Sequence, residues 1–329
     1  MKDGSFLLKR LKGKREYPRG GGTENIMEYL VGVDLGGTNT SVGAVDLDGN
    51  LIKELSRPSG DDGVYSVADV IISLCKELIF EYGKPCGIGI GVPGAVCDGT
   101  IIRTVNLPIS YFEIGKMIES KLGVKYKLIN DANAAALGEY TVMKMKAENV
   151  VLMTIGTGIG GGIIIDGKIY EGANGTAGEI GHTVIRKGGL MCTCGRRGCF
   201  ERYASANALK RQTARAAKLH PESMLANAEK ISGKTAFDCA RAGDKAASEV
   251  VDKYIEYVGE GVCNLINIFQ PEYFLIGGGI SNEGEYFISR VRDYVRKREY
   301  NQFGKRTEIR AASLCNDAGI IGAALYAME

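Results

Sequence analysis

Hydrophobic residues in the first third of the chain come in short runs separated by glycine, a pattern typical of strands and tight turns. Residues 28–47, EYLVGVDLGGTNTSVGAVDL, contain two β-rich runs around a Gly-Gly-Thr break, and a turn at 48–50 leads into a third run, LIKELSRP. Residues 65–82 carry apolar side chains at helical spacing, and Gly83 ends this predicted helix. The segment CGIGIGVPGAV then predicts a buried strand that runs into a Pro-Gly turn.

A second strand–turn–strand pattern follows in the middle of the chain. Residues 149–155 predict a strand, GTGIGGG a glycine turn, and residues 163–165 a returning strand. Because this repeats the hairpin predicted near residue 36, the chain contains a weak internal repeat of supersecondary structure without a repeat of sequence. The other predicted elements are helices at 111–122, 134–144, 205–219 (with Ser205 as N-cap), 246–269 and 285–298, strands at 125–129 and 273–276, and a small-residue helix at the C-terminus.

Three glycine motifs resemble nucleotide loops but lack the right context. A dinucleotide-binding fold needs a strand, a glycine turn and then a helix. Of the two GxGxxG matches, the one at 89–94 contains a proline turn, and the one at 156–161 is followed by a strand pattern. SGKT at 232–235 follows no strand and has Ala228 where a Walker loop needs its first glycine. We therefore expect neither of these folds.

Length and composition fit a globular protein of two domains. The chain has 329 residues, and no apolar run approaches the ~20 residues that a membrane span needs. The net charge is +2, but residues 1–26 carry seven basic and three acidic side chains, so the rest has a slight acidic excess. A body without a basic excess argues against nucleic acid as a partner, and we expect neither a nucleic acid nor a membrane.

The N-terminal segment 1–27 lacks the continuous apolar stretch and the cleavage site of a secretory signal. We expect a disordered leader or an upstream start, with Met27 as the functional beginning, and a basic interaction arm is the alternative. Six cysteines outside the segment 182–201 are scattered, mostly among apolar neighbours, and are expected to be reduced core thiols. These features together predict a cytoplasmic protein.

The segment HTVIRKGGLMCTCGRRGCFE, from His182 to Glu201, predicts a metal site. One of only two histidines and three of the nine cysteines in the chain fall within it. A closed, tetrahedral structural zinc site takes thiolate and imidazole ligands, and the glycines at 188, 189, 195 and 198 would let the backbone fold around an ion. The alternative is three unrelated thiols in a loop. The candidate ligands are His182, Cys192, Cys194 and Cys199.

Two glycine turns predict contacts with phosphate. In DLGGT the glycines would let backbone N–H groups approach phosphate oxygens, and the aspartate would hold Mg²⁺ through water. A plain hairpin turn is the alternative, but the second turn, GTG, favours phosphate, with one threonine hydroxyl donor from each of two lobes. The candidate residues are Asp34, Gly36, Gly37 and Thr38 in the first turn, and Gly156, Thr157 and Gly158 in the second.

Nine motifs occur in an order that resembles the ROK family (repressors, open reading frames and sugar kinases) within the actin and hexokinase superfamily. They are DLGGT, GVPG, NLP, NDANAAALGE, GTGIGGG, GEIGH, CxCGxxGCxE, GGGIS and DAGIIGAA, and the resemblance covers Glu28 to the C-terminus. It implies an α/β chain with a two-lobe ribonuclease H-like (actin/hexokinase-type) fold and with ATP and sugar in the interlobe cleft. The expected lobes are 28–130 plus 317–329, and 131–316 with a zinc loop at 182–201.

Asp131 is the candidate catalytic residue. It follows the predicted strand 125–129, and a carboxylate that projects from a strand end can accept the proton of an attacking hydroxyl. The alternative role is a helix N-cap, which Asn130 or Asn133 fills equally well. The resemblance implies that Asp131 is the general base and that Asn130 contacts the sugar.

Glu179 and His182 of GEIGH are candidate sugar contacts, because a carboxylate and an imidazole both bind hydroxyl groups. If one ring nitrogen of His182 binds zinc, the other is left to donate a hydrogen bond. Glu201 would complete the sugar site, and the resemblance adds Asn106 in VNLP. Many relatives have a tryptophan shortly after NLP, where this chain has Ile-Ser-Tyr at 109–111, so this edge of the sugar site is left open.

The glycines Gly277, Gly278 and Gly279 follow the strand predicted at 273–276 and would form a flat surface for adenine and ribose, or only a tight turn. The resemblance implies ATP, Mg²⁺ and a structural Zn²⁺ as cofactors, and a homodimer or homotetramer as the assembly. The implied reaction is phosphorylation of a hexose at its primary hydroxyl. Glucose is the first candidate, and N-acetylmannosamine, N-acetylglucosamine, allose and fructose are the alternatives.

Two functions of other classes remain to be compared with a kinase. A sugar-sensing repressor of this family carries a helix-turn-helix domain ahead of the shared body, and the leader here is too short for that motif. A sugar-binding module without activity would not need the aspartate of NDANAAALGE, which this chain retains. The sequence therefore favours the kinase.

Overall fold

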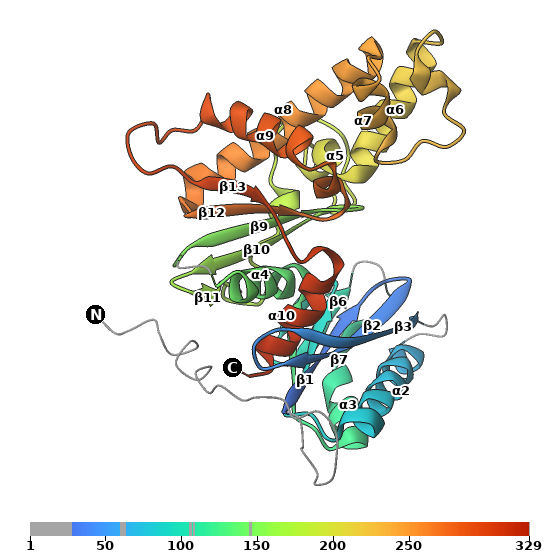
Figure 1. Cartoon of the computed structure of the whole chain (residues 1–329), viewed down its shortest axis with the longest axis vertical. Helices are drawn as coiled ribbons and strands as arrows, with labels where there is room; N and C mark the ends of the chain where they lie inside the picture. Colours follow the sequence, from blue (N-terminus) through green and yellow to red (C-terminus); the bar gives the residue numbers. More distant parts are fainter. Residues whose placement is uncertain (1–27, 60–63, 105–106, 108, 145–146, 329) are drawn as a thin grey trace, which may run out of the picture. The chain divides into compact units, whose positions relative to one another are not determined.

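The computed structural model describes residues 28–59, 64–104, 107, 109–144 and 147–328, which form two compact units (Figure 1). The first unit contains the described residues of 28–144 together with 164–177 and 316–328, and the second contains Ala147–Ile163 and Gly178–Cys315. The predictions made for residues 1–27 and for Asn106 fall outside the described residues. Among the helices that the structure describes, none has the length and apolar character to cross a membrane.

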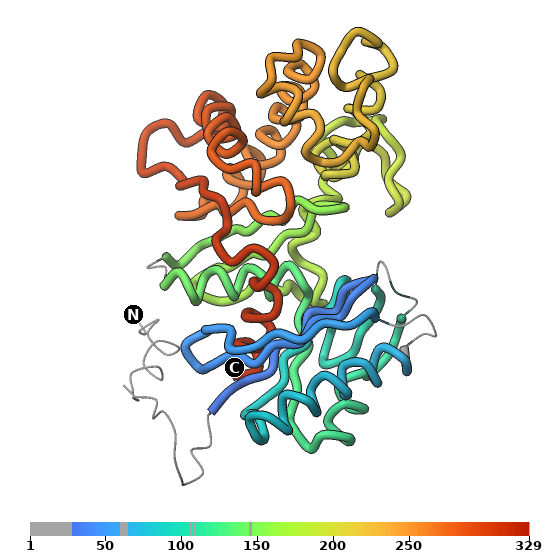
Figure 2. Tube along the Cα trace, turned by 45° about the vertical axis from the view of Figure 1, so that its right-hand side comes forward, coloured from blue at the N-terminus to red at the C-terminus, as the bar shows by residue number. Residues whose placement is uncertain are grey.

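The first unit is built on a five-stranded sheet with the order β3-β2-β1-β4-β8. The strands β1, β2 and β3 form an antiparallel meander, traced in blue in Figure 2, and β4 and β8 join β1 in parallel. The glycine turn and the third run predicted from the sequence are thereby confirmed. The strands are β1 (Tyr29–Leu35), β2 (Asn39–Asp46), β3 (Leu51–Pro58), β4 (Ile88–Val92) and β8 (Tyr126–Asn130).

A second sheet has the equivalent order, β11-β10-β9-β12-β13, with β12 parallel to both β9 and β13. The strands β9, β10, β12 and β13 occupy the places that β1, β2, β4 and β8 occupy in the first sheet. The predicted internal repeat is therefore confirmed. The GTG turn is followed by a strand, which also confirms that its GxGxxG match is no dinucleotide motif. The strands are β9 (Val150–Ile155), β10 (Ile159–Ile165), β11 (Lys168–Ile169), β12 (Tyr273–Gly277) and β13 (Glu308–Ala311).

A small antiparallel sheet in the first unit was not predicted, and it shortens a predicted helix. The helix expected at 111–122 begins only at Ile114, because the residues before it pair with a neighbouring strand. Tyr111 has a φ of 51°, which lies outside the range of a right-handed helix. The elements are β5 (Gly94–Cys97), β6 (Thr100–Thr104), β7 (Ser110–Phe112) and α3 (Ile114–Leu122).

Most of the remaining structure is helical, as predicted. Ser205 accepts a hydrogen bond from the Ala208 N–H over 3.1 Å, so it is the N-cap that the sequence predicted. The short helices α5 and α7 were not predicted. The helices are α2 (Val64–Tyr82), α4 (Asp131–Val142), α5 (Glu201–Ala204), α6 (Ala206–Leu219), α7 (Thr235–Arg241), α8 (Lys245–Phe269), α9 (Glu285–Arg296) and α10 (Ala318–Tyr326), with 3₁₀ turns at Ile180–His182, Met224–Asn227, Gly279–Glu283 and Cys315–Asp317.

Glycines bring α10 into close contact with β1, β4 and α4, as the red and green helices in Figure 1 show. A Cβ atom on Gly32 would lie 1.9 Å from the Ile320 carbonyl oxygen, and one on Gly89 would lie 1.7 Å from that of Ala323. A Cβ atom on Gly322 would lie 1.7 Å from the Ala134 carbonyl oxygen. Close packing of α10 explains these three glycines. Glycine in this chain is therefore not in itself a sign of ligand contact.

The helix α4 belongs with the first unit, whereas the predicted lobe boundary placed residues from 131 onward in the other lobe. The reason is its packing against α10 and β8, both of which are part of the first unit. The segment Ile164–Ala177 groups with the first unit as well. The predicted boundary thus runs through a packed core.

Candidate active site

Three parallel strands of the first unit end at one edge of the sheet, and the candidate polar residues lie at that edge. Asp34 of β1 is paired with Gly91 of β4, and Val92 of β4 is paired with Asn130 of β8. In open α/β sheets, ligands bind beyond the carboxyl ends of such strands. The strand order therefore brings Asp34 and Asn130–Asp131 to the same edge, although they are far apart in the sequence.

Asp34 is mostly buried, and burial raises the pKa of its carboxyl group, with a smaller contribution from the charge of Glu54. A Cβ atom on Gly319 would lie 3.4 Å from the Asp34 Cγ atom, so the carboxyl group faces the first turn of α10. A desolvated carboxylate is relieved by a nearby cation. The position thus fits the predicted role of holding hydrated Mg²⁺.

The turn after Asp34 has a fixed backbone and an exposed tip. The Gly36 N–H donates to the Asn39 carbonyl over 3.0 Å, and a Cβ atom on Gly36 would lie only 2.4 Å from that oxygen. The Ser59 hydroxyl donates to the Gly36 carbonyl over 2.6 Å, a support that the sequence did not reveal. Gly37 and Thr38 are exposed at the tip, and the Thr38 carbonyl accepts from the Ser59 N–H over 2.9 Å. Such a turn can hold phosphate oxygens.

Asn130, and not Asp131, is the N-cap of α4. The Asn130 Oδ1 atom accepts from the N–H groups of Ala132 and Asn133 over 2.9 and 3.1 Å, and its Nδ2 donates to the Gly94 carbonyl over 3.0 Å. Asp131 lies in the first turn and is half-buried, with its Oδ1 atom 2.9 Å from the Ala132 N–H. The capping role that could have explained Asp131 is therefore filled by its neighbour.

In the second unit, the two glycine turns GTG and GGG lie at the ends of adjacent parallel strands. β9 and β12 are parallel, with Thr154 opposite Gly277. Gly278 has a φ of 81°, and a Cβ atom on it would lie 2.6 Å from the Ile155 carbonyl oxygen, so only glycine fits there. The Gly156 N–H donates to the Gly158 carbonyl over 3.0 Å, and Thr157 is exposed between them. The structure therefore brings the turns 156–158 and 277–279 together.

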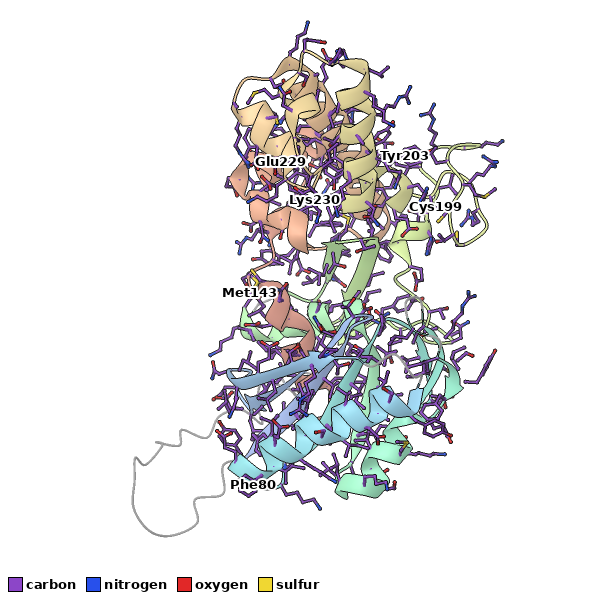
Figure 3. All side chains as sticks on the ribbon, turned by 90° about the vertical axis from the view of Figure 1, so that its right-hand side faces the viewer. Phe80, Met143, Cys199, Tyr203, Glu229 and Lys230 are labelled. Carbon is purple, nitrogen blue, oxygen red and sulfur yellow. The ribbon has the colours of Figure 1, made fainter. Side chains whose placement is uncertain are left out.

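The four candidate zinc ligands form a cluster in the second unit, in the loop that carries Cys199 in Figure 3. Their ligand atoms all lie within 4.8 Å of one another. The Cys192 Sγ to His182 Nδ1 distance is 3.6 Å, and the Cys194 Sγ to Cys199 Sγ distance is also 3.6 Å. A zinc tetrahedron with bonds of about 2.3 Å to sulfur and about 2.0–2.1 Å to nitrogen has edges of about 3.5–3.8 Å. The residues thus fit a closed zinc site.

The thiols of this cluster differ in their surroundings. Burial raises the pKa of Cys199 to about 12 and also raises the pKa of Cys192, whereas the Arg196 backbone N–H lowers the pKa of Cys194. Zinc binds thiolates, so occupation of the site displaces protons from the two buried thiols. Gly198 has a φ of 90°, and a Cβ atom there would lie 1.8 Å from the Arg186 carbonyl oxygen, so the loop needs glycine at this place.

The candidate sugar contacts of the second unit surround this cluster. His182 directs Nδ1 toward Cys192, while its Nε2 lies 4.0 Å from a carboxylate oxygen of Glu179. Glu201 accepts a hydrogen bond from the Cys192 thiol over 3.1 Å. Its other carboxylate oxygen lies 2.9 Å from where a Cβ atom on Gly158 would be. Glu201 thus joins the cysteine cluster to the glycine turn 156–158, a contact that no local pattern predicts.

The predicted site residues are divided between the two units. Asp34, the turn 36–38 and Asn130–Asp131 belong to the first unit. The second unit holds both glycine turns of its sheet, the candidate sugar contacts Glu179, His182 and Glu201, and the candidate metal ligands. Within each unit the described candidates lie at a sheet edge or within and beside residues 182–200, which we call the cysteine loop.

Comparisons with known proteins agree with this arrangement. The chain is 36% identical over 307 residues to a glucokinase of Halalkalibacterium halodurans, a match that covers 89% of this chain and 93% of that protein. A solved ROK family glucokinase from Streptomyces griseus, in complex with glucose and AMPPNP, matches with a TM-score of 0.80 and 32% identity over 91% of this chain and 99% of that one. A xylose repressor of Caldicellulosiruptor bescii is 33% identical over 309 residues, 89% of this chain and 76% of the repressor.

These likenesses confirm the predicted two-lobe actin/hexokinase-type fold class. The family model described as the ROK family matches residues 30–329, nearly the whole of the described chain. With nine motifs in order, two sheets of matching strand order and this match, the chain belongs to the ROK family.

Proposed function

We propose that this chain is an ATP-dependent sugar kinase that transfers the γ-phosphoryl group of ATP to the primary hydroxyl of glucose. The observation that carries the proposal is Asp131, a half-buried aspartate at the carboxyl end of β8 that is not the cap of its helix. The relative with the highest identity given above is a glucokinase, and the similar solved structure, also a glucokinase, holds glucose and an ATP analogue. These likenesses support glucose as the acceptor.

In the proposed mechanism Asp131 accepts the proton of the sugar's primary hydroxyl. The oxygen of that hydroxyl attacks the γ-phosphorus of ATP, and ADP leaves. Asn130 supports this role in two ways. Its side chain caps α4 and so fixes the turn that carries Asp131, and its bond to the Gly94 carbonyl holds the amide in place. The second N–H of that amide is the group that we assign to a sugar hydroxyl.

The other sugar contacts come from the residues around the cysteine cluster. Glu179 and Glu201 would accept hydrogen bonds from sugar hydroxyls, and His182 would donate from Nε2 once Nδ1 is a metal ligand. Asn106 is proposed from the resemblance alone. Hydrogen bonds of this kind discriminate strongly between sugars, because an unmatched buried polar group costs free energy.

The nucleotide contacts are assigned to the glycine turns. The exposed tip at Gly37 and Thr38 and the turn 156–158 would donate backbone and hydroxyl groups to the phosphates, and 277–279 would support adenine and ribose. Asp34 would hold Mg²⁺ through water, and the ion would neutralise charge on the phosphates. Zinc would have no part in the chemistry and would fix the shape of the loop that carries His182 and Glu201, so that its loss would weaken sugar binding.

A coupled assay of ADP production over a panel of sugars tests the proposal. We expect glucose to give the highest kcat/KM, ahead of N-acetylmannosamine, N-acetylglucosamine, allose and fructose, because the glucokinase likeness covers the whole body. A different preferred sugar would overturn glucose as the substrate. A chain that consumes no ATP with any of these sugars would overturn the kinase and leave a sugar-sensing or sugar-binding role of the kind that the xylose repressor likeness suggests.

The assembly and the location of the protein are also proposals. We infer a homodimer or homotetramer and a cytoplasmic location from the family resemblance and from the absence of a signal pattern in the leader. Light scattering after size-exclusion chromatography gives the mass of the assembly, and a monomer would contradict the first inference. Cell fractionation tests the second.

A further inference from the structure

The cysteine loop is fastened at Leu190 by a residue that is not a metal ligand. The Leu190 N–H donates to the Tyr203 hydroxyl over 2.7 Å, and the Gly198 N–H donates to the Leu190 carbonyl over 2.9 Å. Both backbone groups of Leu190 are thus bonded, one to α5 and the other across the loop. The Leu190 side chain is 48% exposed, so these polar bonds rather than apolar burial hold this part of the loop.

Gly189 is the residue that lets the Tyr203 hydroxyl reach the loop. A Cβ atom on Gly189 would lie 2.0 Å from the Tyr203 oxygen and 2.9 Å from the Arg186 carbonyl oxygen. The sequence suggested that this glycine lets the backbone fold around an ion. Its position shows a different reason, since the space that a side chain would fill is taken by the tyrosine hydroxyl.

Tyr203 itself is held firmly in the second unit, and Figure 3 labels it beside Cys199. Its side chain is 4% exposed, and its ring lies 5.1 Å from that of Tyr257 on α8. From α6, the Gln212 Nε2 donates to the Tyr203 carbonyl over 2.8 Å. A buried ring packed against Tyr257, on a backbone held by Gln212, gives the hydroxyl a defined position, which a flexible side chain would not.

The same short helix carries Glu201 and is seated on α8 at two further points. Phe200, immediately before it, is fully buried, and a Cβ atom on Gly261 of α8 would lie 2.1 Å from its ring. The Tyr254 hydroxyl, also from α8, donates to the Ala204 carbonyl over 2.8 Å. The helix α5 is therefore a rigid connection between α8, the cysteine loop and the Glu201 carboxylate.

We propose that Tyr203 is a positioning residue that clamps the cysteine loop to α5 without the help of a metal. The clamp keeps the loop attached to α5 at Leu190, so that the loop does not unfold when the metal leaves, whereas the metal would set the positions of its four ligands. The consequence for sugar binding rests on the proposed function. The consequences for metal release and for backbone protection do not.

The test compares Tyr203→Phe with Tyr257→Phe in the full-length protein. The first change removes the acceptor of the Leu190 N–H and keeps the ring, whereas the second removes a hydroxyl from the neighbouring ring and keeps the bond. In metal-free protein we expect faster hydrogen exchange in peptides covering 186–191 for Tyr203→Phe only. After loading with zinc, we expect that variant to release zinc to a chromogenic chelator about 3–10-fold faster, the range for one lost hydrogen bond. Exchange and zinc release equal to those of the wild type would overturn the clamp.

Steady-state kinetics test the link to the sugar. Tyr203→Phe is expected to raise KM for glucose by about 3–10-fold with kcat nearly unchanged, because the hydroxyl positions the loop whose Cys192 bonds Glu201 and is not assigned to the reacting atoms. An unchanged KM would overturn the link between the clamp and the sugar site. A protein without kinase activity toward any sugar would instead overturn the proposed function, and the exchange and zinc readouts would still decide on the clamp.

Discussion

Asn130 and Asp131 are adjacent, yet the structure gives their side chains different tasks. Asn130 is tied to three backbone groups, and Asp131 follows it in the first turn of α4. The sequence allowed either residue to be the cap. The hydrogen bonds decide between them, because Asn130 caps the helix, so capping does not explain Asp131, which is our candidate base.

Replacing Asp131 by asparagine should lower kcat by about 10²–10⁴-fold, the usual contribution of a general base. Glucose affinity should be kept, since the amide still forms hydrogen bonds. The comparison is Asp48→Asn, which changes an exposed carboxylate in the turn after β2. Steady-state kinetics and calorimetric titration with glucose measure the two effects. A near-normal kcat in Asp131→Asn would rule out the role of Asp131.

Asp34 gives a prediction for stability against pH. Burial raises its pKa, so the folded protein binds the proton more tightly than the unfolded chain does. The free energy of unfolding therefore falls as the pH rises from the ordinary aspartate pKa through the raised pKa of Asp34. It stays lowered at neutral pH. In Mg²⁺-free protein, Asp34→Asn should raise Tm at pH 7, with a gain that shrinks as the pH falls below the ordinary value, and it should lower kinase activity.

The check is differential scanning calorimetry of both proteins at pH 7 and at an acidic pH at which both remain folded. Asp48→Asn again serves as the comparison and should leave Tm nearly unchanged. A lower Tm for Asp34→Asn at pH 7 would contradict a destabilising buried charge. The residue would then be explained as part of a stabilising ion pair or hydrogen-bond network.

At the scale of elements, the contact of α4 with α10 determines where Asp131 lies. A Cβ atom on Gly322 would lie 1.7 Å from the Ala134 carbonyl oxygen, one helical turn from Asp131. Gly322→Ala must therefore push the helices apart. We expect a loss of about 1–3 kcal/mol in the free energy of unfolding, as for other overpacked cores, together with a lower kcat.

Chemical denaturation and kinetics of Gly322→Ala measure both effects. Gly304→Ala is the matched control, because the nearest atom to its Cβ would be 3.6 Å away in an exposed loop. A Gly322→Ala protein as stable and as active as the Gly304→Ala protein would show that the two helices tolerate separation.

The cysteine loop gives a prediction about metal removal. We expect one zinc per chain by metal analysis, and a higher KM for glucose after chelation, because the loop positions Glu179, His182 and Glu201. Cys194→Ser should lose the metal, and Cys315→Ser, which also changes an exposed cysteine, should keep it. A metal-free protein with unchanged kinetics would contradict a role of zinc in shaping the sugar site.

Much of the fold was predictable from local patterns, and what was missed depends on distant contacts. Glycine turns between apolar runs predicted β1–β3 and the hairpin of β9 and β10. These signals lie in the residues of the strands and turns themselves, so no distant contact has to be known. The strand β7 was taken for the start of a helix, since its pairing with β6 is not visible in its own residues. In the same way, the residues around Gly89 and Gly322 in the sequence do not show that the neighbours of these glycines are helix carbonyls.

The candidate site shows the same division. The metal ligands were predictable because all four fall within one short segment. The contact between Glu201 and Gly158, and the bond from Leu190 to Tyr203, connect the turn 156–158 and the cysteine loop to α5, and spacing along the chain contains no sign of either. The metal ligands were therefore easier to predict than the contacts that hold their loop in place.

At the scale of the whole molecule, the first unit is assembled from three separate stretches of sequence, and the last of them carries α10. A chain that ends after Cys315 would lack this helix and expose the faces of β1, β4 and α4 that it covers. We expect that truncated protein to be insoluble or molten, as judged by circular dichroism and dye binding. Removal of residues 1–26 is the comparison and should leave folding and activity intact.

The separation of α10 from β1 along the chain also sets an order of events during synthesis. Domains usually begin to fold from the N-terminus while translation proceeds. Here the strand that bears Asp34 is made long before the helix that packs beside it, and most of the second unit lies between them. The sheet of the first unit must therefore wait, with one face uncovered, until the second unit has been synthesised. During that interval the nascent protein exposes an apolar surface of the kind that promotes aggregation.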